Sequence, residues 1–116
     1  MSNVSTDNTN PSTDAVMCQI SASGVARITL NRPEIHNAFD DILIGDLTAK
    51  LESLNADPLV RVILLSGAGK SFSAGADLNW MKRMAGYSHD ENLEDSRKLA
   101  KLMKVLNFAS KPTIGL

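Results

Sequence analysis

A leucine stripe followed by a continuous aliphatic run limits this chain to a small set of architectures. The leucines recur four, four and three residues apart, at Leu43, Leu47, Leu51 and Leu54. This spacing predicts one apolar face of a helix over residues 40–55, which Asn55 to Pro58 ends. The run from Val60 to Leu65 that follows is typical of a strand buried on both faces. A helix that leads into such a strand predicts an α/β architecture.

The segments on either side extend the same alternation. Residues 16–20 and 25–30 are β-rich runs around a Ser- and Gly-containing turn, which predicts a hairpin that Pro33 ends. Residues 66–75 are mostly small and predict a loop, and Asp77 is placed to cap a short helix over residues 78–85.

A longer helix is predicted to follow. Ser88 and Glu91 form a capping-box pattern for a helix that runs to about Phe108. Its inward face is predicted to carry Leu99, Leu102, Met103 and Leu106. Pro112 closes this helix, and residues 113–116 read as the start of another buried strand.

Composition argues against several classes of partner. The chain has 116 residues and a formal net charge of -1, so it offers no field that attracts nucleic acid or an anionic membrane. No window approaches the ~18 apolar residues needed to span a bilayer. The single cysteine, Cys18, has no partner for an internal disulfide and is interpreted as a buried or half-buried thiol in a reducing cytoplasm. His36 and His89 lack carboxylates at ligand spacing, so we expect no metal site.

The first fifteen residues have a composition of their own. Eleven of residues 1–15 are Ser, Thr, Asn or Asp, with no Lys, no Arg and no apolar core segment. This pattern is typical neither of a secretory signal nor of a transit peptide, and it predicts a disordered polar leader and a cytoplasmic protein.

Two glycine-containing segments could bind a ligand. Gly69-Lys70-Ser71 resembles the end of a phosphate-binding P-loop, but the first glycine of that motif would fall on Leu64, inside the predicted strand, which argues against nucleotide triphosphates. The segment from Phe72 to Leu78 is a strand-exit loop of small residues before a helix start. Such a loop can point free amides at an oxyanion, or it can simply let the helix pack near the strand.

Two motifs in order indicate a family. Asn31-Arg32-Pro33-Glu34-Ile35-His36-Asn37-Ala38-Phe39 and Phe72-Ser73-Ala74-Gly75-Ala76-Asp77-Leu78 resemble the N-terminal part of the crotonase superfamily of enoyl-CoA hydratases and isomerases. The resemblance covers residues 16–116 and implies the N-terminal portion of a crotonase-like (ClpP/crotonase) ββα spiral, incomplete in this chain. Ser73, Asn79-Trp80-Met81 and the segment 93–100 most resemble 3-methylglutaconyl-CoA hydratases of leucine breakdown.

The resemblance also implies roles for individual residues. Ala76 matches the position whose backbone N–H is the first oxyanion-hole donor to the thioester carbonyl of an acyl-CoA. The positions matched to coenzyme A binding are Glu34, Ile35, His36, Ala74, Gly75, Asp77 and Leu78. Some relatives carry a lysine for the CoA phosphates where this chain has Glu34, which leaves Arg32 or Lys70 as substitutes.

The remaining implications concern the reaction. The second oxyanion donor and the hydratase glutamates lie, in the family, beyond the strand that Lys111 begins, so we expect this chain to be truncated before them and inactive alone. The complete form is expected to be a carbon–oxygen lyase that hydrates an enoyl-CoA, possessing no cofactor apart from the coenzyme A of its substrate, and to form a homotrimer or a hexamer. Double-bond isomerisation, thioester hydrolysis and a non-catalytic CoA-binding or interaction module are the alternatives.

Overall fold

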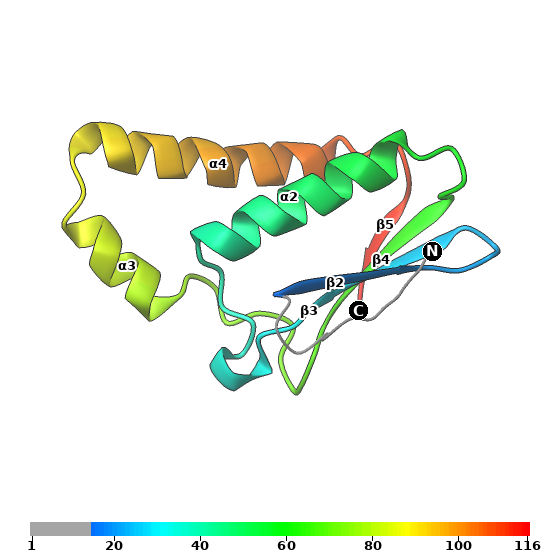
Figure 1. The fold of residues 1–116 in the computed structure, drawn as a ribbon, viewed down its shortest axis with the longest axis horizontal. Coiled ribbons are helices and arrows are strands. Elements are labelled where there is room, and N and C mark those ends of the chain that lie inside the picture. The colour runs from blue at the N-terminus through cyan, green and yellow to red at the C-terminus, as the bar shows by residue number, and fades with distance from the viewer. Residues whose placement is uncertain (1–14) are drawn as a thin grey trace.

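The computed structural model describes residues 15–116, so the predicted polar leader lies, apart from Ala15, outside the described residues. A four-stranded sheet runs in the order β2 (Val16–Ile20), β3 (Val25–Leu30), β4 (Val62–Gly67) and β5 (Thr113–Gly115) (Figure 1). The β2–β3 pair is antiparallel, whereas β3–β4 and β4–β5 are parallel. This order confirms the predicted hairpin and the predicted α/β architecture.

Helices make the connections between the parallel strands. The helix α2 (Asp41–Ala56) joins β3 to β4, and α3 (Leu78–Ala85) and α4 (His89–Asn107) join β4 to β5. In Figure 1, α2 and α4 run side by side over the sheet, and the two helices contact each other. A short 3₁₀ turn, η2 (Pro33–Ile35), which the sequence reasoning did not predict, follows β3.

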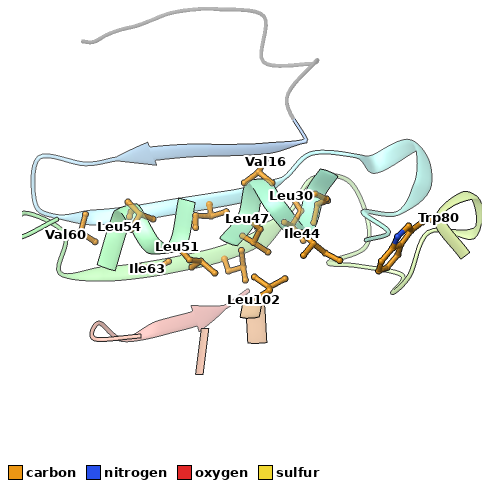
Figure 2. Close-up of a cluster of buried hydrophobic side chains, with 14 residues drawn as sticks. Val16, Leu30, Ile44, Leu47, Leu51, Leu54, Val60, Ile63, Trp80 and Leu102 are labelled. Carbon is orange, nitrogen blue, oxygen red and sulfur yellow. The ribbon is translucent and has the colours of Figure 1, made fainter. Parts of the chain in front are cut away.

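The hydrophobic core lies between α2 and the sheet. Figure 2 shows side chains of α2 and of the strands meeting there, with Leu102 of α4 and Trp80 of α3 at the margins. Its fully buried aliphatic members include Ile28, Leu30, Leu43, Ile44, Leu47, Leu51 and Ile63. Burial of each such side chain contributes about 1.5–3 kcal/mol, so this cluster holds the elements that carry the loops of the site.

The buried strand differs from its prediction in position and in coverage. It begins two residues late, at Val62, because the Arg61 N–H instead donates to the Gly24 carbonyl at 2.8 Å in the hairpin turn. It also continues through Ser66 and Gly67, which pair in register with the end of β3 and do not belong to the loop. Burial on both faces is wrong for the described residues: Ile63 is buried, whereas Val62 and its same-face neighbours are half-buried because both long helices cover one face.

The inward face predicted for α4 is only partly correct. Leu102 is fully buried and Leu106 is half-buried, but Leu99 is 36% exposed and Met103 is 46% exposed. The helix lies against α2 along a narrow stripe. Within residues 15–116, most of its apolar side chains are therefore not covered by another element. None of the described helices is long and apolar enough to cross a membrane.

Candidate active site

The two motifs singled out in the sequence meet beyond the carboxyl ends of β3 and β4. These strands are parallel, so residues 31–40 and residues 68–77 leave the sheet at the same edge. Figure 1 shows the η2 turn and the loop after β4 at this one end, next to α3. The carboxyl edge of parallel strands is the usual ligand site of open α/β sheets, and the glycine-containing loop is therefore placed where a ligand can reach it.

A single parallel bridge joins the two motifs at Phe39 and Ala76. The Phe39 N–H donates to the Gly75 carbonyl at 2.5 Å, and the Phe39 carbonyl accepts from the Asp77 N–H at 2.6 Å. The Gly75 carbonyl and the Ala76 N–H belong to one peptide unit, and in a trans peptide these groups point in opposite directions. The Ala76 N–H therefore points away from Phe39.

The outward Ala76 amide is left without an internal acceptor. Within residues 15–116 it makes no hydrogen bond, and Ala76 is exposed. Its neighbours behave differently: the Ala74 N–H donates to the His36 carbonyl at 2.9 Å, and the Gly75 N–H donates to Ser73 Oγ at 3.1 Å. An exposed N–H held in a fixed direction can donate to an anionic oxygen at no cost in reorganisation.

Buried Asn37 holds the two loops together. Its side-chain Nδ2 donates to the Ala68 carbonyl at 2.9 Å and to the Ser71 carbonyl at 2.8 Å, and its Oδ1 accepts from the Arg32 N–H at 2.7 Å. The Asn37 carbonyl accepts from Ser73 Oγ at 2.9 Å. With a φ of 55° and no exposed surface, Asn37 is a fully satisfied polar group at the centre of the site.

Gly67 makes this close approach possible. A side chain at Gly67 would place its Cβ 2.6 Å from the carbonyl oxygens of Ser71 and Phe72 and 2.7 Å from Asn37 Nδ2. Only glycine leaves room for the loop to fold back against the end of β4. Gly75, whose φ is +90°, sets the direction of the peptide unit that precedes Ala76, and it has open space where a Cβ would lie.

Two aspartates and one arginine lie directly behind the bridge. Asp40 caps α2 through Leu43 N–H at 2.8 Å, and Asp77 caps α3 through the Asn79 and Trp80 amides at 2.7 and 3.1 Å. The Arg32 guanidinium lies 2.5 Å from Asp40 Oδ2 and 3.8 Å from Asp77 Oδ2. Asp77 is thus a buried cap whose carboxylate faces the protein, and its main-chain N–H and carbonyl are already bonded to Phe39 and Met81.

The residues matched to coenzyme A form the rim of this site. Glu34 and Ile35 lie in η2, and His36 follows them in a left-handed conformation, with its Nδ1 3.3 Å from Ser71 Oγ. Ala74 and Gly75 are exposed on the facing loop, and Leu78 is exposed at the start of α3. The structure therefore places these positions at one edge of the sheet, where Arg32 faces carboxylates and Lys70 is exposed, and their part in binding coenzyme A stays a prediction.

An open cavity of about 880 Å³ with a mixed apolar and polar lining lies beside the loop, beneath α4. Phe72, Leu65 and Leu106 line it together with Met103 and Lys104, and Thr113 and Gly115 of β5 also contribute. Sequence reasoning missed this cavity, the buried Asn37 and the role of Arg32. The available signal for Asn37 was its position as a polar residue between a turn and the apolar pair Ala38-Phe39. Nothing in the sequence pattern indicates the cavity.

Three comparisons with known proteins bear on this geometry. A profile of the family described as enoyl-CoA hydratase/isomerase matches residues 21–115. A Thermus thermophilus protein assigned as an enoyl-CoA hydratase is 38% identical over 99 residues, 85% of this chain and 39% of the relative. The Escherichia coli 1,2-epoxyphenylacetyl-CoA isomerase is 46% identical over 56 residues, which are 48% of this chain and 21% of that protein.

Solved structures of enoyl-CoA hydratases have the same fold as this chain over the part that it covers. The crystal structure of an enoyl-CoA hydratase from Shewanella pealeana superposes with a TM-score of 0.85 and 40% sequence identity. The match covers 88% of this chain and 38% of the solved chain. The arrangement described above is therefore the crotonase fold over part of its length, as the two motifs indicated.

Proposed function

Because the chain belongs to the enoyl-CoA hydratase/isomerase family, we propose that its 72–78 loop binds the thioester carbonyl oxygen of an acyl-CoA through the Ala76 N–H. One observation carries this proposal: the Ala76 amide is exposed, points away from its bridge partner Phe39 and has no acceptor within residues 15–116. A hydrogen bond to the carbonyl oxygen stabilises the negative charge that develops there when the thioester becomes an enolate.

For the whole protein we propose hydration of an enoyl-CoA, a carbon–oxygen lyase activity written in the reverse direction. The oxygen of water bonds to the β-carbon as the water gives up one proton, the electrons of the double bond move toward the carbonyl to form the enolate, and the α-carbon then takes a proton as the carbonyl re-forms. The chain spans 39% of the length of the Thermus relative, and Ala76 supplies one donor of this machinery. A polypeptide of these 116 residues alone is therefore expected to show no turnover when loss of enoyl-thioester absorbance is followed.

Isomerisation is the second candidate reaction. It is favoured by the description of the matching family, which includes isomerases, and by the similarity to the Escherichia coli isomerase. Both reactions pass through charge on the same thioester oxygen, so both can use the same amide. Thioester hydrolysis and a non-catalytic CoA-binding module remain alternatives, and the module is the outcome if a CoA thioester binds without polarisation of its carbonyl.

A branched substrate of leucine breakdown is our narrower proposal, together with a cytoplasmic homotrimer or hexamer for the complete protein. The support is the resemblance of Asn79-Trp80-Met81 to 3-methylglutaconyl-CoA hydratases. The three residues lie in different environments. Trp80 is 5% exposed and packs in the core, whereas Asn79 and Met81 are exposed in the first turn of α3, next to the 72–78 loop. Any contribution of the tripeptide to substrate selection therefore rests on Asn79 and Met81.

The test uses butyryl-CoA labelled with ¹³C at its carbonyl, a thioester that has no double bond to hydrate. Binding to the chain should lower the carbonyl stretching frequency, because the Ala76 N–H draws charge onto the oxygen. Ala76→Pro removes the donor and should abolish this shift, whereas the control Ala76→Ser keeps the N–H and should retain it.

The same pair of variants gives the kinetic effect in a protein that turns over. Loss of one oxyanion donor should lower kcat about a hundredfold, roughly 3 kcal/mol, with little change in binding of free CoA. Thermal unfolding must show that Ala76→Pro is folded. A folded Ala76→Pro variant with the wild-type carbonyl shift would show that this loop is only a structural connection.

A further inference from the structure

The residues that follow the two partners of the Phe39–Ala76 bridge have the same role. Asp40 follows Phe39 and caps α2, and Asp77 follows Ala76 and caps α3. Each aspartate uses Oδ1 for the helix amides and directs Oδ2 toward Arg32. One guanidinium thus faces both N-cap carboxylates, and the bridge that presents the Ala76 amide lies between the capped helices and the edge of the sheet.

We propose that Arg32 is the positioning residue of the Ala76 N–H. Arg32 links the N-cap carboxylates of α2 and α3 and so fixes the two segments of the chain that form the bridge. This inference rests on the proposed function for its chemical purpose. Its structural part, the dependence of the Ala76 direction on Arg32, stands on the contacts alone.

A guanidinium suits this geometry better than a single point of positive charge. Arg32 Nη1 donates to Asp40 Oδ2 at 2.5 Å, and Nη2 lies 3.8 Å from Asp77 Oδ2, within reach of charge attraction but too far for a hydrogen bond, so two nitrogens of one planar group face two carboxylates. Lysine is a single point of charge and cannot face both with fixed geometry. Asp40 and Asp77 are 8% and 7% exposed, so loss of their partner leaves two neighbouring carboxylates with little solvent to separate their charges.

The link from Arg32 to the amide is short. The Asp77 N–H donates to the Phe39 carbonyl. In the second hydrogen bond of the bridge, the Phe39 N–H donates to the Gly75 carbonyl, which belongs to the same peptide unit as the Ala76 N–H. A shift of Asp77 or Asp40 therefore turns this peptide unit directly, without any intermediate side chain. Arg32 itself does not touch the proposed ligand.

The chain offers a matched control. Arg83 of α3 pairs with Asp41 of α2 at 2.8 Å, so this ion pair connects the same two helices. It lies on the surface, with side chains 48% and 37% exposed, and it does not involve either N-cap. Arg83→Lys should therefore reproduce the change in residue type without affecting the bridge.

The experiment compares wild type, Arg32→Lys and Arg83→Lys in the 116-residue chain uniformly labelled with ¹⁵N. In Arg32→Lys, the Ala76 amide resonance should shift, and the capped amides of Leu43 and Asn79 should exchange about fivefold faster, as expected when N-caps weaken. With labelled butyryl-CoA, the carbonyl shift should be reduced while affinity for free CoA, which has no thioester carbonyl, is unchanged. Arg83→Lys should match wild type in every measurement.

Each other outcome has a definite meaning. A folded Arg32→Lys variant with wild-type Ala76 resonance and carbonyl shift overturns the inference, as does an equal effect of Arg83→Lys. If wild type itself gives no carbonyl shift, the proposed function fails, and the ligand-free Ala76 resonance still decides whether Arg32 fixes the amide. If Arg32→Lys does not fold, Asp77→Asn replaces it, since asparagine caps a helix as well as aspartate but does not pair with the guanidinium.

Discussion

The two long helices cross between parallel strands in the same way but differ in how much of the chain covers them. Six residues of α2 are buried, whereas Leu102 alone is buried in α4 among the residues described. The helix α2 contacts both the sheet and α4 and buries its leucine stripe completely. The contrast teaches that apolar periodicity predicts a helix and its apolar face, but not whether anything covers that face.

The difference in burial between α2 and α4 should appear most strongly in the free energy of unfolding, and substitutions in α2 should lower it most. Leu51→Ala removes a fully buried side chain and should lower the free energy of unfolding by about 3 kcal/mol. Met103→Ala, at a position 46% exposed on α4, should cost less than about 1 kcal/mol. Urea denaturation followed by circular dichroism measures both. Equal costs would mean that α4 is packed as tightly as α2, and the comparison would fail.

A smaller effect is expected where α4 begins. Ser88 Oγ accepts from the Glu91 N–H at 3.2 Å, and Glu91 Oε1 accepts from the Ser88 N–H at 2.9 Å, which is a complete capping box. Because few side chains of α4 are buried, local hydrogen bonds should contribute a large part of the stability of its first turn. Ser88→Ala should cost about 1 kcal/mol locally, seen as faster amide exchange at Glu91.

Amide exchange within α2 provides the control for this cap. The Leu43 and Leu47 amides should not change in Ser88→Ala, because α2 is held by its own cap and by the core. Uniformly faster exchange throughout the chain would instead indicate that the two helices unfold as one unit.

The smallest expected effect is a pH dependence of the free energy of unfolding that arises from Cys18, a residue packed against the core. Burial raises the pKa of the Cys18 thiol, and the positive charge of Lys50 opposes this only in part. The folded chain therefore holds the thiol proton more tightly than the unfolded chain. The contribution of Cys18 to the free energy of unfolding should be constant below the ordinary thiol pKa, ~8.5, and should fall as pH rises above it. Cys18→Ala should flatten this dependence in alkaline urea titrations.

The fold could be predicted from the sequence where local chemistry decides the structure. Asp77 and Ser88 are side chains that satisfy helix amides within three residues, and the helices they begin lie where the sequence predicted them. The start of β4 was misplaced because a long-range bond to Gly24, and not the aliphatic run, holds Arg61 outside the strand.

The candidate site divides in the same way. The loop around Ala76 was identified from its small residues and from its resemblance to a family. The partners of Arg32 and Asn37 were not identified, because Asn37 contacts a carbonyl at Ala68, 31 positions away, and such pairings have no spacing rule. The assignment of the oxyanion donor to Ala76 stays a prediction until its amide is tested.

The bridge at Phe39 and Ala76 also bears on how this site tolerates mutation. The proposed donor is part of the main chain and its direction comes from a carbonyl on the same peptide unit, so the side chain of residue 76 takes no part in it. At this position most point mutations in the gene would leave the functional group chemically intact, and proline is the substitution that deletes it. A survey of mutations at residue 76 should therefore find tolerance limited by side-chain size, together with strong selection against proline.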